Sequence, residues 1–530
     1  MLSYNTTKMQ SYSQEHPNEP KQTDTFLHKE TPYKTNDSLV HRPTHRNHNI
    51  SMENVGHHFN VQSLRHHKNS ERRTKTMPKL IPIRKKSKAI TKLTIGILLY
   101  IIAITTVSAQ DKLIIISPHP ESIESEFGTN FEKWYKEKTG KTVETDWRDL
   151  GGTSSNYRHI ESEFKRVPEG IGIDIFFGGG TDSYLRLADN NLLVSYKLPE
   201  KQLEQIPQNY NGIPVYDAKY RWYGTALSSF GIMYNEQLRQ LLKLPEATKW
   251  EDLGKTDLIN NIGAADPRES GSAHMMYEII LQTHGWEKGF ALLTKLGGNV
   301  KKFTAGSNEI PRDIVNGEVI YGLAIDFYAY SQIVVVGEDK IKFILPADGT
   351  VVNPDSIAIL KGAPNIEIAK LFLQFVLSEQ AQKLWMLRDT DDEGPKWKGG
   401  LNRGSVLPAL YEKLGNRCVV TNPFTLKNPP FPYDSNTGST RWDIVNDLFG
   451  TLIIDSHEDL VDAWKAIGKC KDAKKREAAI AALVEMPLTE TEAMNIAETK
   501  WKDQVYRNQK IKEWGQFAKQ KYKKAKNLAK

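Results

Sequence analysis

The chain has 530 residues, 39% of them apolar, which is enough to build two or more core-forming units. Its formal charge of +7 is unevenly distributed, because 17 Lys and Arg against 7 Asp and Glu fall in residues 1–109, which leaves 54 against 57 in residues 110–530. The basic character therefore belongs to the N-terminal segment, and we expect no nucleic-acid partner.

The first 76 residues are polar, contain nine of the fourteen histidines and show neither helical nor strand periodicity, so we expect residues 1–76 to be disordered. Histidine-rich tracts can chelate metals. These histidines, however, have no Cys or carboxylate ligands at metal-site spacing, and a solvated tail is favoured.

Residues 77–109 have the pattern of a secretory signal peptide. A basic cluster is followed by an apolar run that ends in Val107-Ser108-Ala109. This pattern predicts export, with cleavage after Ala109. An uncleaved membrane anchor is the alternative, but the run is short for a bilayer span. A further hypothesis is that Met77 is the true start of translation.

From Asp111 onward strand and helix patterns alternate, which indicates an α/β architecture. Three times a strand pattern runs into a turn and then into residues that cap helices, at 148–164, 173–184 and 262–286. The expected caps are Thr153, Ser154 or Ser155, then Thr181 or Asp182, then Ser270 and Ser272. Helix N-termini suit anionic or polar ligands, and open α/β sheets bind ligands at the carboxyl ends of strands, so the three turns are expected to line one cleft.

Motifs of nucleotide binding and serine hydrolysis do not fit these turns. "GGGTDSY" at 178–184 lacks the Lys of a P-loop, and "ESGSAH" at 269–274 lacks the flanking glycines of a nucleophile elbow. A hydrolase that pairs Ser272 with His274 is an alternative, but residues two apart at a helix start do not face each other. We predict a protein that is not an enzyme and has no cofactor.

The two cysteines, Cys418 and Cys470, would lie in an oxidising compartment after export. A disulfide between them and two free thiols are both open, because the sequence does not show whether they are close.

Six segments, taken in order, carry a family resemblance. They are "WRDLGGTSS" (147–155), "DIFFGGGTDSY" (174–184), "RWYGTALSSFGIMYNE" (221–236), "AADPRESGSAHMMYEIILQTHGWEKGFALL" (264–293), "YGLAIDFYAY" (321–330) and "NPDSIAILKGAPN" (353–365). Together they resemble the extracellular solute-binding proteins of ABC importers, in the family 1 branch that includes ferric-iron and phosphorylated-compound binders. The resemblance covers roughly residues 111–465.

The resemblance implies a two-lobed type II periplasmic-binding fold, in which two α/β lobes are joined by crossing segments. It places the first part of lobe 1 at 110–225, a crossing at 226–234, lobe 2 at 235–350, and the return segment with the rest of lobe 1 at 351–427. A helical C-terminal region is then expected at 428–500.

Residues 501–530 are expected to form a basic helical tail, with ten Lys and Arg against two acids and interleaved aromatic residues. Such a helix can rest on an anionic membrane surface. We favour a solvated helix that packs its aromatic face on the body.

The resemblance also implies function: a monomer captures a small-molecule or ion ligand between its lobes, closes, and delivers it to an ABC permease in the membrane. One alternative is a ferric-iron binding protein of an iron importer. A second alternative is an exported ligand receptor for a sensor kinase, and a third is an exported enzyme.

Matching the family's pocket loops residue by residue implies a set of ligand-binding positions and no metal ligands. These are Gly152, Thr153, Ser154, Gly179, Gly180, Thr181, Ser229, Ser270, Gly271, Ser272, Asp326 and Tyr328. Ferric binders of the family use two adjacent tyrosines, because phenolate suits a hard cation. This sequence has Phe327-Tyr328 there, so a phosphorylated or other anionic solute is favoured over iron.

Other contacts remain open at this stage. Asp326 with Tyr328 could still hold a metal, an amine or a sugar hydroxyl. Arg148, Arg268 and His274 lie near the expected caps and could pair with a phosphate.

Overall fold

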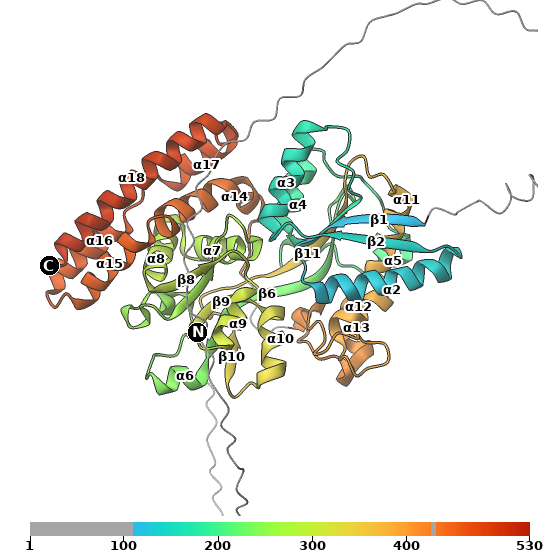
Figure 1. Cartoon of the computed structure of the whole chain (residues 1–530), viewed down its shortest axis with the longest axis horizontal. Helices are drawn as coiled ribbons and strands as arrows, with labels where there is room; N and C mark the ends of the chain where they lie inside the picture. The colour runs from blue at the N-terminus through green and yellow to red at the C-terminus, as the bar shows by residue number, and fades with distance from the viewer. Residues whose placement is uncertain (1–109, 426–430) are drawn as a thin grey trace, which may run out of the picture. The chain divides into compact units, whose positions relative to one another are not determined.

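The computed structural model describes residues 110–425 and 431–530 (Figure 1). The expected disordered segment, signal peptide and cleavage site therefore lie outside the described residues. Within the described ranges, none of the helices combines the length and apolar character needed to cross a membrane.

A ten-stranded mixed sheet is the framework of the fold, with the order β2-β1-β3-β11-β6-β9-β7-β8 and with β10 and β12 paired to β6. Its strands are β1 (Asp111–Ile116), β2 (Val143–Arg148), β3 (Ile175–Gly180), β6 (Tyr223–Asn235), β7 (Ile262–Ala265), β8 (Val300–Thr304), β9 (Tyr321–Ile325), β10 (Ile341–Ile344), β11 (Val352–Ile359) and β12 (Gly404–Ser405). A separate two-stranded ribbon joins β4 (Asn209–Tyr210) to β5 (Ile213–Pro214).

Strand β6 belongs to both halves of this sheet. Its residues 223–229 pair antiparallel with β11, and its residues 230–234 pair antiparallel with β9. We call the half that contains β1, β2, β3 and β11 lobe 1, and the half that contains β7, β8 and β9 lobe 2. Since β10 pairs with the second part of β6, the chain returns to lobe 1 within residues 345–351.

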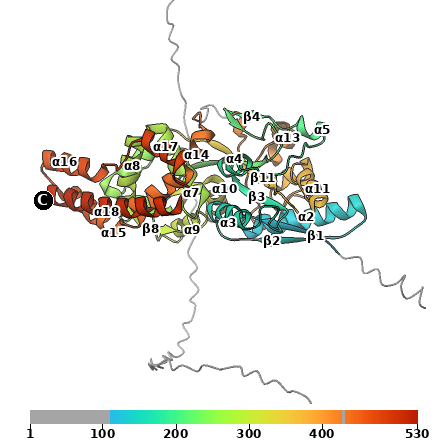
Figure 2. The same cartoon turned by 90° about the horizontal axis from the view of Figure 1, so that it is seen from above.

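Helices cover both lobes (Figures 1 and 2). Those of lobe 1 are α2 (Glu121–Thr139), α3 (Thr153–Arg166), α4 (Thr181–Asp189), α5 (Glu200–Leu203), α11 (Ile366–Val376), α12 (Glu379–Met386) and α13 (Pro408–Leu414), with short 3-10 turns η3 (Gly415–Arg417) and η4 (Pro423–Thr425). Those of lobe 2 are α6 (Glu236–Leu241), α7 (Gly271–His284), α8 (Trp286–Asn299), α9 (Glu309–Val315) and α10 (Asp326–Val336), with 3-10 turns η1 (Trp250–Gly254) and η2 (Thr256–Leu258).

Local sequence explains how the first helix packs. Helix α2 buries Ile123, Phe127 and Phe131, which are spaced four residues apart and so share one face. The ring of Phe127 lies 4.3 Å from that of Trp385 in α12, and the helix ends at Gly140, whose φ of +74° favours glycine.

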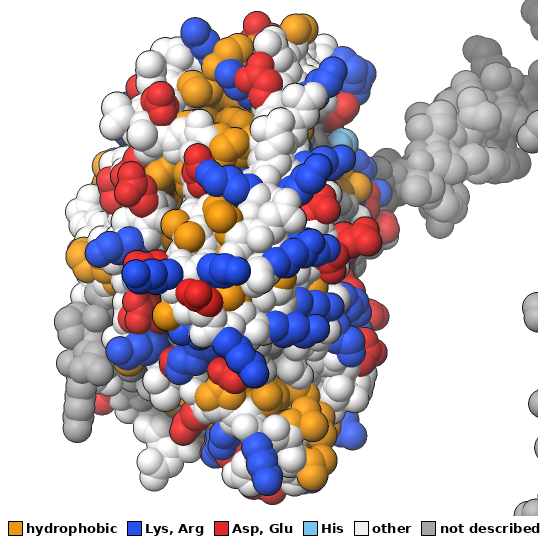
Figure 3. Space-filling model, turned by 90° about the vertical axis from the view of Figure 1, so that its left-hand side faces the viewer, with side chains coloured by type: hydrophobic (Ala, Val, Ile, Leu, Met, Phe, Trp, Pro, Cys, Tyr) orange, Lys and Arg blue, Asp and Glu red, His pale blue; other side chains and the backbone are white. Residues whose placement is uncertain are grey.

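The C-terminal region is helical, as expected, with α14 (Ser435–Phe449), a π-helical turn (Gly450–Ile454), α15 (His457–Lys469), α16 (Ala473–Val484), α17 (Glu490–Thr499) and α18 (Gln504–Leu528). Helix α18 turns Trp514 and Tyr522 inward. Figure 3 shows Lys and Arg side chains spread over the side of the molecule that lies on the left in Figure 1, with acidic and apolar side chains between them.

Candidate ligand-binding site

A cavity of about 360 Å³ lies between the two lobes. The starts of helices α3 and α4 line it from lobe 1, and the starts of α7, α9 and α10 line it from lobe 2. Helix N-termini carry N–H groups without intrahelical partners and the positive end of the helix dipole. Their convergence makes this cavity suitable for a negatively charged or strongly polar ligand.

Two of the expected helix caps are wrong. The residues at the N-cap positions of α3 and α4 are Gly152 and Gly180, and neither helix has a side-chain cap. Thr153 and Thr181 are instead the first helical residues. The third expectation is confirmed at Ser270, whose Oγ accepts a hydrogen bond of 3.3 Å from the Ala273 N–H. Because glycine has no side chain to cap the helix, the first N–H groups of α3 and α4 remain available to a ligand.

Close approach of the two lobes requires glycine at this site. A Cβ on Gly271 would lie 2.7 Å from the Cβ of Thr153, and a Cβ on Gly152 would collide with the Glu269 carbonyl oxygen. The start of α3 therefore packs directly against the start of α7, and this contact closes one side of the cavity.

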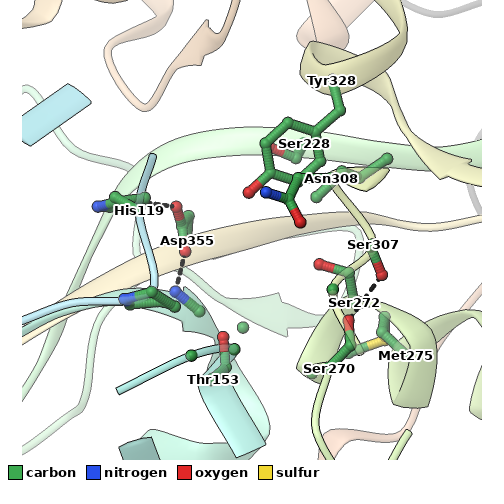
Figure 4. A pocket seen from close by; sticks show the side chains of 18 of the residues that line it. His119, Thr153, Ser228, Ser270, Ser272, Met275, Ser307, Asn308, Tyr328 and Asp355 are labelled. Carbon is green, nitrogen blue, oxygen red and sulfur yellow. Dashed lines mark hydrogen bonds and ion pairs between the residues drawn. The ribbon is translucent and has the colours of Figure 1, made fainter. Parts of the chain in front are cut away.

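Eight of the twelve residues implied by the family resemblance line the cavity. They are Gly152, Thr153, Gly179, Gly180, Ser270, Gly271, Ser272 and Tyr328. Figure 4 shows Tyr328 and Ser272 approaching from lobe 2 and Thr153 from lobe 1.

The other four do not line the cavity, because their side chains are engaged in the fold. Ser154 Oγ donates to the Pro267 carbonyl over 3.1 Å, and Thr181 Oγ1 donates to Asn353 Oδ1 over 2.8 Å. Ser229 donates to Asp326 Oδ2 from its N–H over 2.6 Å and from its hydroxyl over 2.8 Å. Asp326 thus holds β6 to the start of α10. Burial raises the pKa of Asp326 to about 6, although the hydrogen bonds from Ser229 oppose that shift.

The sequence-based set missed a buried charged group in the lobe 1 wall. Arg403, 1% exposed, places Nη1 2.5 Å from Asp355 Oδ2, and His119 Nε2 lies 2.8 Å from the same oxygen. Asp355 Oδ1 also accepts the Gly179 N–H. No motif points to Arg403 in "LNRGSV", and Asp355 lies in a quoted segment without being singled out.

The Arg403 charge and the hydrogen bond with His119 stabilise the ionised carboxylate of Asp355. Burial alone would raise the pKa of Asp355, but Arg403 and His119 together lower it well below its usual range. Burial lowers the pKa of His119 despite the nearby Asp355 carboxylate. A neutral His119 beside an Asp355–Arg403 ion pair leaves this part of the wall with no net charge.

Further polar side chains face the cavity from both lobes. Tyr328, Asn308 and Ser228, which are labelled in Figure 4, line the cavity. Asn353 is buried, lines the cavity, and has no hydrogen-bond partner for its Nδ2 among the described residues. An unpaired buried amide is costly, so a ligand oxygen that accepts from Asn353 would be stabilising.

The basic residues near the turns do not reach the cavity. Arg268 pairs with Asp266 at 2.8 Å and with Asp455 at 3.0 Å, and Arg148 lies 3.4 Å from Asp146 on the surface. His274 is fully buried, and its Nδ1 lies 2.7 Å from Asn446 Oδ1. Among the described residues, His274 forms no hydrogen bond with Ser272. The phosphate-pairing hypothesis is therefore wrong for these three residues.

Two other open questions are answered by the described residues. Cys418 and Cys470 are both free thiols. In residues 110–425 and 431–530 no group of three or more His, Cys, Asp and Glu side chains is arranged to hold a metal, and Tyr328 is the one tyrosine among the described residues that line the cavity.

Two α/β lobes that share a strand and enclose a polar cavity define a ligand-binding protein of the two-lobed periplasmic type. Residues 172–390 match the family model of bacterial extracellular solute-binding proteins. This confirms the family resemblance and the α/β fold with an added helical C-terminal region.

Known proteins of this type resemble the chain in sequence or in fold. The chain is 26% identical over 251 residues to the phosphoglycerate transport regulatory protein PgtC of Salmonella typhimurium, an alignment that covers 47% of this chain and 58% of the relative. The periplasmic binding protein AfuA of Actinobacillus pleuropneumoniae, solved with fructose-6-phosphate, is 20% identical, with a TM-score of 0.52 over 67% of this chain and 98% of AfuA. The apo ferric ion-binding protein A of Pasteurella haemolytica is 14% identical, with a TM-score of 0.50 over 66% of this chain and 98% of that protein. At these identities the structural likenesses concern the fold.

Proposed function

We propose that the protein captures a small phosphorylated solute in the interlobe cavity and, after export and removal of the leader at Ala109, delivers it as a monomer to an ABC permease. The convergence of the uncapped starts of α3 and α4 with the start of α7 carries this proposal. Phosphate oxygens accept several N–H bonds at once, and helix N-termini favour their negative charge.

The side chains around these helix starts match the same ligand. Thr153 and Ser272 offer hydroxyls, and Asn353 offers an amide donor without a partner among the described residues. Tyr328 and Asn308 face the remaining space, where they can bind hydroxyl groups of an esterified sugar or acid. The names of two similar proteins, a phosphoglycerate transport regulator and a binder of fructose-6-phosphate, are consistent with this class of solute.

Titration calorimetry of the full chain tests the proposal. We expect 3-phosphoglycerate, glycerol 3-phosphate or fructose 6-phosphate to bind, each more tightly than inorganic phosphate, and Thr153→Ala with Ser272→Ala to weaken the binding. Ser195→Ala is the control, because its hydroxyl donates to the Lys219 carbonyl at an exposed site away from the cavity.

The main alternative is a ferric-iron binding protein, and the same experiment separates the two. Tight binding of ferric citrate with a phenolate-to-iron absorption band, without binding of any phosphate ester, would contradict the proposal. Turnover of a bound ester would instead indicate an exported enzyme.

A further inference from the structure

Helix α14 contacts both lobes, although it lies beyond the segment that matches the family. Figures 1 and 2 both place it beside α4 of lobe 1 and α7 of lobe 2. Helices α4 and α7 both begin at the cavity, so α14 connects two of the helices that form its walls.

Two side-chain contacts join α14 to α4. The hydroxyl of Tyr433, just before α14, donates to the carboxylate of Asp182 in the first turn of α4. One turn further along α4, Arg186 forms an ion pair with Asp443 of α14, and its guanidinium also lies 4.2 Å from the centre of the Tyr157 ring. Both contacts are largely shielded from water, which strengthens them relative to surface pairs.

The contacts of α14 with α7 are more extensive. Arg441 and Glu278 form an ion pair of 2.6 Å with both side chains buried. The Trp442 ring stacks on His274 at 3.7 Å, and His274 Nδ1 lies 2.7 Å from Asn446 Oδ1. Helix α14 is therefore fastened to lobe 2, and the contacts of Tyr433 and Asp443 tie it to lobe 1.

Trp442 also lines the cavity between the lobes. It lies on the side where α7 begins, packed on a residue of the first two turns of that helix. A ligand held by the starts of α4 and α7 would thus meet α14 through this one side chain.

We propose that α14 sets the separation of α4 and α7, and with it the width of the interlobe cavity, with Trp442 as a wall of that cavity. Opening the lobes then requires the loss of the Asp182–Tyr433 and Arg186–Asp443 contacts. Two direct contacts also join the lobes. Ser154 Oγ donates to the Pro267 carbonyl, and Arg158 pairs with Glu269, but this pair is exposed on both sides and contributes little to closure.

Distance measurements on the ligand-free full chain test this inference without knowledge of the solute. Spin labels at Lys133→Cys in α2 and Lys288→Cys in α8, both exposed, report the interlobe distance in a Cys418→Ser, Cys470→Ser background. We expect Tyr433→Phe with Asp443→Asn to give a longer mean distance and a broader distribution. An unchanged distribution would overturn the inference.

Asp447→Asn is the matched control, because Asp447 lies one turn along the same helix and bonds Arg507 and Trp501 of the C-terminal region instead of lobe 1. Asp447→Asn should leave the interlobe distance unchanged. A shift as large as that of the Tyr433→Phe, Asp443→Asn double variant would overturn the inference. If the double variant fails to fold, Asp443→Asn alone is measured in the same way.

The role of Trp442 has its own readout, which rests on the proposed solute site. Binding of 3-phosphoglycerate should change the intrinsic fluorescence of the wild-type chain, and Trp442→Phe should remove most of that change. A full change in Trp442→Phe would overturn the role of Trp442. Absence of phosphate-ester binding would count against the proposed function, while the spin-label distances would still decide the role of α14.

Discussion

Arg403 and Asp355 form an ion pair with a 2.5 Å Nη1–Oδ2 contact inside the lobe 1 wall of the cavity, with the guanidinium 4.1 Å from the centre of the Phe327 ring of lobe 2. Arg403→Met would leave the Asp355 carboxylate buried beside a neutral His119. Removing one partner of a buried pair costs about 3–5 kcal/mol. Urea unfolding should therefore show a large loss of stability.

Arg417→Met is the control for this variant, because Arg417 pairs with Asp391 at the surface and its loss should change the unfolding midpoint little. Asp355→Asn added to Arg403→Met should restore part of the stability, since it removes the unpaired charge. Equal effects of the two arginine variants would contradict the proposed importance of the buried pair.

The stability of the protein should fall in acid partly through His274. Burial lowers the pKa of His274 to about 3, although the hydrogen bond that His274 donates to Asn446 Oδ1 opposes that shift. Below pH 6.5 the unfolded chain binds a proton here that the folded chain does not, so stability decreases as pH falls from about 6.5 towards 3, by up to about 1.4 kcal/mol per pH unit. His274→Gln should make the melting temperature less dependent on pH over this range.

The contact between Gly271 and Thr153 should be needed for tight solute binding. Gly271→Ala places a Cβ 2.7 Å from the Thr153 Cβ and forces the starts of α3 and α7 apart. Overpacking of this kind costs about 1–3 kcal/mol, which is about a 5- to 150-fold increase in Kd if the cost falls on the closed form. Titration calorimetry with a phosphate ester measures this change in Kd.

The control for that variant is Gly515→Ala in α18, where the nearest atom to the added Cβ is Thr451 Cγ2 at 3.7 Å. It should bind the ester like the wild type. If Gly271→Ala also binds normally, the start of α3 does not approach α7 in the bound form.

Tyr328 distinguishes the two solute classes. Loss of its hydroxyl in Tyr328→Phe removes at most one neutral hydrogen bond to a phosphate ester, worth about 0.5–1.5 kcal/mol, so the Kd should rise by about 2- to 10-fold. A ferric site would lose a phenolate ligand and with it the coloured complex. Tyr330→Phe, on the same helix and more exposed, should have no effect on either ligand.

The sequence predicted the scaffold of the site better than its side-chain contacts. Alternating strand and helix patterns predicted the α/β scaffold from Asp111 onward, because helices such as α2 bury one face against the core. The hydroxyl residues after each strand indicated helix starts, but Thr153 and Thr181 lie one residue past the N-caps. The N-caps are Gly152 and Gly180, where an added Cβ would meet the Glu269 carbonyl oxygen and the Asn353 amide, respectively.

Such sequence patterns do not predict contacts between residues that are far apart in the chain. Asp355 and Arg403 meet only because β11 and β12 both pair with β6, and neither residue belongs to a recognisable motif. In the same way, Ser229 and Asp326 were expected to face the solute, but they bond each other because β6 and β9 are neighbours. Register across a sheet of distant strands decides which polar residues face a cavity.

The order of strands in lobe 1 also governs how the chain reaches its native state. Strand β11 lies between β3 and β6 and pairs Ile357 with both Phe177 and Tyr223, so the lobe stays incomplete until all of lobe 2 has been synthesised. Pairings between such distant positions slow folding, because the loop-closure entropy is lost before the contacts form. Fragments that end before residue 352 should therefore expose the edges of β3 and β6, and the complete chain should fold more slowly than a protein whose strands pair in chain order.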